Sequence, residues 1–161
     1  MDTVHKMVIC LNGHMITDNE DIDAITTGFC PKCGEKLISK CPICKNYIPG
    51  ETTSDDFVFV GFPSEPVPNY CAHCGNAYPW TKRAIDSAKE LINFSKKLND
   101  KEKQQLAESI PDLISDTPRT KIAIVKFKLL SKKAGSTIAS GLHDILVDVV
   151  SETVKKTLFG Y

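Results

Sequence analysis

The stretch FCPKCGEKLISKCPICKN, residues 29–46, contains two C-x-x-C pairs separated by only seven residues. Two further pairs of candidate ligands flank it, Cys10 with His14 on the N-terminal side and Cys71 with Cys74 on the C-terminal side. Seven cysteines and one histidine make eight ligands, which is the number that two tetrahedral metal sites require. The sequence therefore predicts two four-ligand metal sites, and the number is complete only if His14 is a ligand.

The composition of the chain, 161 residues of which 42% are hydrophobic, is that of an ordinary globular protein. Its first residues are too polar for a signal peptide, and no apolar run is long enough to span a bilayer. We therefore expect a cytoplasmic protein. In a reducing cytosol an odd number of cysteines favours metal binding over disulfides, and a thioredoxin-like C-x-x-C would need a βαβ context that the pattern lacks.

Each C-x-x-C pair can act as half of a metal site, because its tight turn brings both sulfurs to one ion. The residue after the second cysteine often needs a positive φ, which glycine adopts without strain. Gly34 and Gly75 stand at this position, whereas Lys45 stands there in the third pair. Gly13 lies between the ligands of the first pair, where the three-residue spacer needs a flexible residue.

The order of the pairs leaves two ways of sharing the ions. Sequential pairing gives site 1 (Cys10, His14, Cys30, Cys33) and site 2 (Cys41, Cys44, Cys71, Cys74), whereas a cross-brace joins the first pair with the third. We favour sequential pairing, because the fifteen residues between His14 and Cys30 suit a short β-hairpin. His73 lies between two ligating cysteines and is expected to point away from the ion. Iron fits four thiolates nearly as well as zinc, but the histidine favours two structural zinc ions.

The segments FCPKCGEKLISKCPICKNYI and YCAHCG resemble the double zinc ribbon, and this resemblance implies the sequential pairing. Together with VICLNGHMI, YCAHCGNAYPWT and SIPDLISDTPRT, they are similar to a family of small uncharacterised bacterial proteins, a domain of unknown function. Members of that family join an N-terminal pair of zinc ribbons to a helical C-terminal region. The resemblance covers most of the chain, and it implies an architecture without implying an activity.

Charge and cysteine content both change near residue 80. Residues 1–80 carry five Lys and ten Asp or Glu, a net charge of −5, whereas residues 81–161 have a net charge of +5. All seven cysteines precede the change. We therefore predict a small α+β protein, with a metal-stapled double zinc ribbon of short β-hairpins in residues 1–80 and a helical domain in residues 81–161. Within the loop 46–70, the apolar run 57–62 predicts a packed strand, with an exposed contact site as the alternative.

The apolar spacing after residue 81 predicts helices at about 82–98, 101–117 (short helices), 119–133 and 136–158. Asn99 is expected to cap the second segment with Glu102, and Pro111 to open another turn. The helix at 119–133 is basic and amphipathic, with apolar residues at Ile122, Val125, Leu129 and Leu130. Its basic residues are Arg119, Lys121, Lys126, Lys128, Lys132 and Lys133. They complement a stripe of acidic residues on the last helix, Asp144, Asp148 and Glu152.

We expect a protein that is not an enzyme, because eight ligands for two ions leave no open coordination position for a substrate. The first functional expectation is a protein-interaction or assembly module, in which the C-terminal helices contact a partner chain or a second copy. Nucleic-acid binding through residues 119–133 is an alternative, since zinc thiolates lower the charge of the ribbon to about −8 and repel phosphate there. Peripheral membrane association through the same helix is a further alternative.

Overall fold

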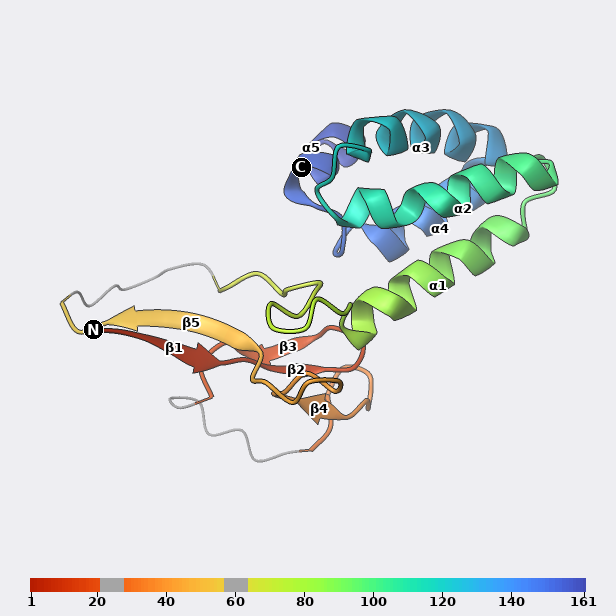
Figure 1. Cartoon of the computed structure of the whole chain (residues 1–161). Coiled ribbons are helices and arrows are strands. Elements are labelled where there is room, and N and C mark those ends of the chain that lie inside the picture. The colour runs from red at the N-terminus through yellow and green to blue at the C-terminus, as the bar shows by residue number, and fades with distance from the viewer. Residues whose placement is uncertain (21–27, 57–63) are drawn as a thin grey trace. The chain divides into compact units, whose positions relative to one another are not determined.

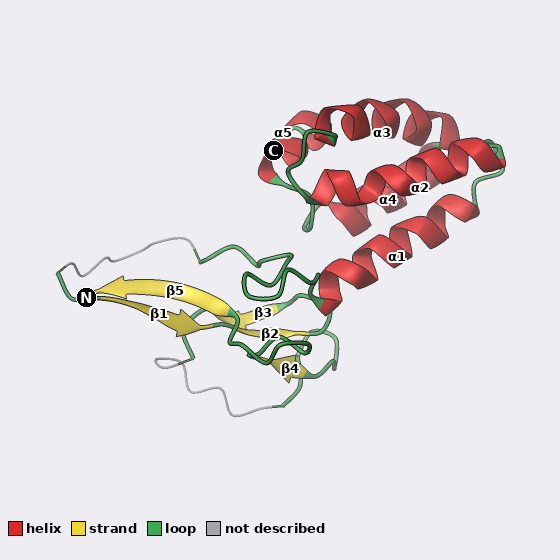
Figure 2. Ribbon diagram, viewed as in Figure 1, coloured by secondary structure: helices red, strands yellow, loops and turns green. Residues whose placement is uncertain are grey.

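The computed structural model describes residues 1–20, 28–56 and 64–161 (Figure 1). The strand predicted at 57–62 lies outside the described residues, as do residues 21–27 of the segment expected to form a hairpin between His14 and Cys30. In these described residues, strands occupy the N-terminal part and five helices follow them (Figure 2). The predicted small α+β fold is therefore confirmed.

The chain divides into two compact units, residues 1–81, here called the ribbon unit, and residues 82–161, here called the helical unit. In the ribbon unit, β1 (Asp2–Lys6) pairs with β5 (Pro49–Ser54) in an antiparallel sheet. A second antiparallel sheet has the strand order β3-β2-β4 (Figure 1). Its strands are β2 (Val8–Cys10), β3 (Met15–Thr17) and β4 (Leu37–Ile38).

The core of the ribbon unit is small and includes metal-site cysteines. Met7, Ile9 and Ile48 are fully buried, and they cluster with Tyr78 and Trp80. The same cluster contains Cys41 and Cys71. The rings of Tyr78 and Trp80 stack with centroids 4.7 Å apart, and the Trp80 indole N–H donates to the carbonyl of Pro68 at 2.9 Å. The end of the ribbon sequence is therefore packed against its beginning.

The helical unit contains most of α1 (Pro79–Asn93) and the whole of α2 (Asp100–Ile114), α3 (Thr120–Ala134), α4 (Ser136–Leu146) and α5 (Glu152–Phe159). α1 begins before the predicted residue 82, because proline is well suited to the first turn of a helix. The predicted cap of α2 is confirmed. The Asn99 side chain accepts from the N–H of Glu102, whose carboxylate accepts from the N–H of Asn99.

Three helix predictions are wrong. The helix predicted at 82–98 ends at Asn93, where Phe94 and Ser95 donate to the carbonyls three residues before them instead of continuing the α-helical pattern. The short helices predicted at 101–117 form one helix that ends at Ile114, with Pro111 inside its last turn. The buried face continues across the proline, since Ile110 and Leu113 are both fully buried. The single helix predicted at 136–158 is two helices, because Ser151 caps α5 by accepting from the N–H of Val154.

α3 occupies nearly the predicted residues, but most of the apolar residues named for its amphipathic face are not the ones that it buries. Ala123, Phe127 and Ala134 are among its buried residues, whereas Ile122, Val125 and Leu129 are exposed. The predicted complementarity with the acidic stripe is also not seen among the ion pairs of the described residues. There, α3 and its N-cap pair instead with α2, Lys133 with Glu102 and Arg119 with Asp112. Within the described ranges, no helix is long and apolar enough to cross a membrane.

Candidate metal centres

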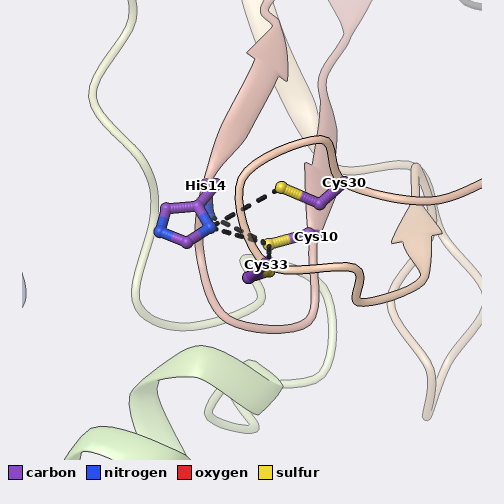
Figure 3. Close-up of side chains that lie close together, drawn as sticks. All are labelled: Cys10, His14, Cys30 and Cys33. Carbon is purple, nitrogen blue, oxygen red and sulfur yellow. Dashed lines mark hydrogen bonds between the residues drawn. The ribbon is translucent and has the colours of Figure 1, made fainter.

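Site 1 is formed by two short turns that approach each other in the ribbon unit (Figure 3). Cys10 ends β2, and His14 follows it after a tight turn, while Cys30 and Cys33 lie on the loop that precedes β4. The His14 Nδ1 atom lies 3.5 Å from the Cys10 sulfur and 3.6 Å from the Cys30 sulfur. The Cys10 and Cys33 sulfurs are 3.7 Å apart. All four ligand atoms therefore face a common point.

Site 2 is built from two C-x-x-C turns that are separated by 26 residues in the sequence. The Cys41 sulfur lies 3.8 Å from the Cys74 sulfur, and the Cys44 sulfur lies 3.6 Å from that of Cys71. In each site, all four ligand atoms lie within 4.8 Å of one another. The structure thus brings together the two groups of residues that sequential pairing requires.

These distances fit a bound metal ion and exclude disulfides. A zinc–sulfur bond of about 2.3 Å places the sulfurs of a tetrahedral site about 3.8 Å apart. A zinc–nitrogen bond of about 2.0–2.1 Å places nitrogen about 3.6 Å from each sulfur. The measured separations match both values, whereas a disulfide needs about 2.05 Å, and all seven cysteines are free. Both groups could therefore hold a metal ion.

The three C-x-x-C turns share one backbone geometry. The residue after the second cysteine donates its N–H to the carbonyl of the first, at 2.8 Å for Gly34, 3.0 Å for Lys45 and 2.8 Å for Gly75. Its φ is +75°, +65° and +73° in these turns. The predicted need for a positive φ is confirmed. Lys45 adopts it with a side chain present, which strains the backbone.

The Cys10–His14 turn depends on Gly13. This residue has a φ of +88°, and a Cβ atom built on it would lie 3.0 Å from the Cβ of Trp80. The turn is closed by a hydrogen bond from the Gly13 N–H to the Cys10 carbonyl, and the His14 N–H donates to the Cys10 sulfur at 3.3 Å. The prediction that this spacer needs glycine is confirmed by both the conformation and the lack of space.

Each site combines a thiol that resists ionisation with one that ionises readily. Burial raises the pKa of Cys10 in site 1 and of Cys41 in site 2. Backbone N–H groups lower the pKa of Cys33 and of Cys71 to about 6, the N–H of Glu35 and that of Cys74 being the largest causes. Hydrogen bonds thus favour the thiolate form of Cys33 in site 1 and of Cys71 and Cys74 in site 2, and the thiolate is the form of cysteine that binds metals.

Site 2 has supporting side chains that the spacing of the cysteines did not predict. The amide groups of Asn46 and Asn76 donate to the Cys44 and Cys74 sulfurs at 3.3 and 3.4 Å. Burial raises the pKa of Tyr78, and a hydrogen bond with Cys71 raises it further, so the phenol stays protonated and is the donor to that sulfur. The asparagines had a signal in the sequence. Both halves of site 2 read C-x-x-C-x-N.

The remaining candidate residues are not among the ligands of either site. His73 is exposed and belongs to neither group of ligands. The basic residues predicted as contacts lie on α3 or at its N-cap, and all except the partly buried Lys126 are exposed. They are Arg119, Lys121, Lys126, Lys128, Lys132 and Lys133.

Comparison with known proteins gives a family and no activity. None of the curated proteins and none of the solved structures matches the chain. A family model described as "Uncharacterized protein conserved in bacteria (DUF2321)" matches residues 3–158. The match includes every ligand of both sites and nearly all of the helical unit. The chain therefore belongs to this bacterial family, as the resemblance of its cysteine segments implied.

Proposed function

We propose that the protein is a non-catalytic interaction module, in which two structural zinc ions hold the ribbon unit and the helical unit docks on another component of the cell. In its general form the proposal covers a partner chain, a second copy of this chain or another surface that contacts the C-terminal helices. Free thiols persist in reducing compartments, so a cytoplasmic location is part of the proposal.

The absence of catalysis is supported by the completeness of both ligand sets. A catalytic zinc usually has three protein ligands and one open position. Each site here offers four protein ligand atoms within 4.8 Å, so an ion held by all four has no position for a substrate. Zinc is preferred over iron because site 1 contributes the imidazole of His14.

Docking through the helical unit is supported by one observation, the exposure of three aliphatic residues on α3. Ile122, Val125 and Leu129 are exposed to 51, 56 and 66%. They form a continuous apolar surface, here called the aliphatic stripe, because residues three and four apart share a helix face. Contiguous exposed apolar residues mark contact sites more often than isolated ones do.

The proposal is tested by replacing the aliphatic stripe with serine (Ile122→Ser, Val125→Ser, Leu129→Ser) in the full-length, zinc-loaded protein. We expect the triple variant to keep both metal ions and its helicity, because none of the three residues belongs to the buried core. We expect the triple variant to lose the association that the wild type shows by light scattering or in complexes isolated from its host. Phe94→Ser is the matched control, because Phe94 is equally exposed but lies outside α3. Equal association of wild type and triple variant would contradict the proposal.

A further inference from the structure

The aliphatic stripe is the outer face of a helix that already packs through its other side. Thr120, Ala123, Phe127, Ser131 and Ala134 are buried on the inner face of α3. The stripe residues are spaced three and four apart, and they lie on the opposite side of the helix from this buried face. The stripe is thus a second apolar surface and not a part of the core that has been left incompletely covered.

Lysines line the aliphatic stripe on both sides. At 100° per residue, Lys121, Lys128 and Lys132 project along one edge, and Lys126 and Lys133 along the other. α3 carries no acidic residue. Within the described ranges, only Lys133 of these five lysines has an ion pair, with Glu102 of α2. The surface is therefore an apolar ridge between two cationic edges, on a chain whose formal net charge is zero.

A second copy of the chain does not suit this surface, because two such stripes would bring lysines against lysines. Three aliphatic side chains also provide far less than the roughly 800 Å² per partner that stable protein interfaces bury. The centres of protein interfaces favour aromatic residues and arginine and disfavour lysine, whereas this surface has lysine and no exposed aromatic residue. The phosphates of a nucleic acid can pair with the lysines, but the apolar ridge between these lysines would contribute little to the binding of phosphates.

An anionic bilayer surface satisfies both parts of the pattern. Aliphatic side chains can enter the boundary between headgroups and acyl chains, while lysines on either side extend their long stems to reach lipid phosphates. Juxtamembrane lysines are attracted by the negative surface potential of such a bilayer. We propose that α3 binds flat against an anionic membrane surface through the aliphatic stripe and its lysine edges. This inference rests on the proposed docking role of the helical unit.

The test is co-sedimentation of the zinc-loaded full-length protein with vesicles of phosphatidylcholine, alone or mixed with phosphatidylglycerol. We expect binding only to the mixed vesicles, with a loss of affinity as salt is raised. The neutralised variant removes three lysines of one edge (Lys121→Gln, Lys128→Gln, Lys132→Gln). It should bind about a hundredfold more weakly, because each lysine near an anionic surface contributes roughly a factor of five.

Matched controls separate this surface from general charge and general hydrophobicity. Three exposed lysines at or near α1 are replaced in the charge control (Lys82→Gln, Lys89→Gln, Lys96→Gln), and Phe94→Ser is the apolar control. Both controls should bind like the wild type, whereas the stripe variant (Ile122→Ser, Val125→Ser, Leu129→Ser) should not bind. In Val125→Trp, the added indole should shift its emission to shorter wavelength on mixed vesicles, which reports entry of the stripe into the bilayer.

Failure of the lipid inference can be told apart from failure of the proposed function. Membrane docking would be overturned if the wild type did not bind mixed vesicles. It would also be overturned if the controls lost as much binding as the neutralised variant. If that wild type still associates with a protein in a stripe-dependent way, the proposed docking function stands with a protein as its partner. If it binds duplex DNA instead, and the stripe variant binds equally well, the lysines alone form a nucleic-acid site and both proposals fail.

Discussion

Sites 1 and 2 use similar ligands, but they occupy different positions in the ribbon unit. Cys41 and Cys71 of site 2 belong to the buried cluster that includes Ile9 and Ile48, whereas no ligand of site 1 belongs to it. Cys33 of site 1 is exposed. Each site buries two of its cysteines, Cys10 and Cys30 in site 1 and Cys41 and Cys71 in site 2, but only those of site 2 pack in this cluster.

Both sites have supporting side-chain hydrogen bonds, and site 2 has more of them. Four thiolates around a divalent zinc ion leave a charge of about −2, whereas three thiolates and an imidazole leave about −1. Site 2, the more negative site, has the side-chain donors Asn46, Asn76 and Tyr78, whereas site 1 has Asn12 at Cys33. Such donors orient ligands and offset their charge. We therefore expect site 2 to determine the stability of the ribbon unit.

The largest expected effect is that of removing both metals. Zinc binding to structural sites contributes about 10–16 kcal/mol, which is comparable to the whole stability of a small domain. We expect elemental analysis to find two zinc ions per chain, and a chelator to unfold the ribbon unit while the helical unit keeps its helicity. Hydrogen exchange can follow both units in one sample. Protection of Ile9 and Ile48 that survives complete chelation would contradict this expectation.

Replacing one ligand should separate the two sites. Cys71→Ser removes a site 2 ligand from the core, and we expect it to release one zinc ion and expose the amides around Ile48. Cys33→Ser and His14→Ala should each release one ion but leave the amides of the core protected. Native mass spectrometry and hydrogen exchange give the two readouts.

The control for these substitutions is His73→Ala, which changes an exposed residue outside both ligand groups. It should release no metal. Loss of an ion from this variant, or equal exposure of the core in the Cys33→Ser and Cys71→Ser variants, would remove the distinction between the sites.

The sequence was informative where chemistry imposes a fixed spacing. Eight ligands in four pairs predicted the two clusters, and Asn99 with Glu102 predicted the cap of α2. It was less informative about which face of α3 packs, because Ile122 and Ile124 are equally apolar and only the neighbouring helices decide which one is buried. The break after α4 was also not evident from the apolar pattern, because the apolar spacing continues through Val149 and Val150 although Ser151 caps a new helix.

Tyr78 offers an intermediate effect that is confined to site 2. Tyr78→Phe removes the hydroxyl that hydrogen-bonds with Cys71 but keeps the ring that stacks on Trp80. Loss of such a supporting group typically lowers metal affinity about 10–100-fold. We expect competition with a chromophoric chelator to show this loss for one of the two ions. Tyr47→Phe is the control, because Tyr47 is partly exposed and lies outside both sites. An equal loss of affinity for both ions would mean that Tyr78 acts on the whole ribbon unit and not on site 2 alone.

The smallest expected effect concerns Lys45, which has a φ of +65° in a turn where the other two C-x-x-C pairs use glycine. A residue with a side chain costs about 1–2 kcal/mol in this conformation, and glycine removes most of that cost. The hydrogen bond from the Lys45 ammonium to the carbonyl of Pro42 opposes the gain, since the substitution removes it. An exposed hydrogen bond of this kind contributes less than the conformational strain, because water replaces the lost partner. We therefore expect Lys45→Gly to stabilise the ribbon unit by about 1 kcal/mol in denaturant unfolding of the zinc-loaded protein.

Gly75→Ala, which introduces the same strain into the other half of site 2, should destabilise the ribbon unit by a similar amount. A Lys45→Gly protein less stable than the wild type would show that the lysine contact, and not the backbone, dominates this turn.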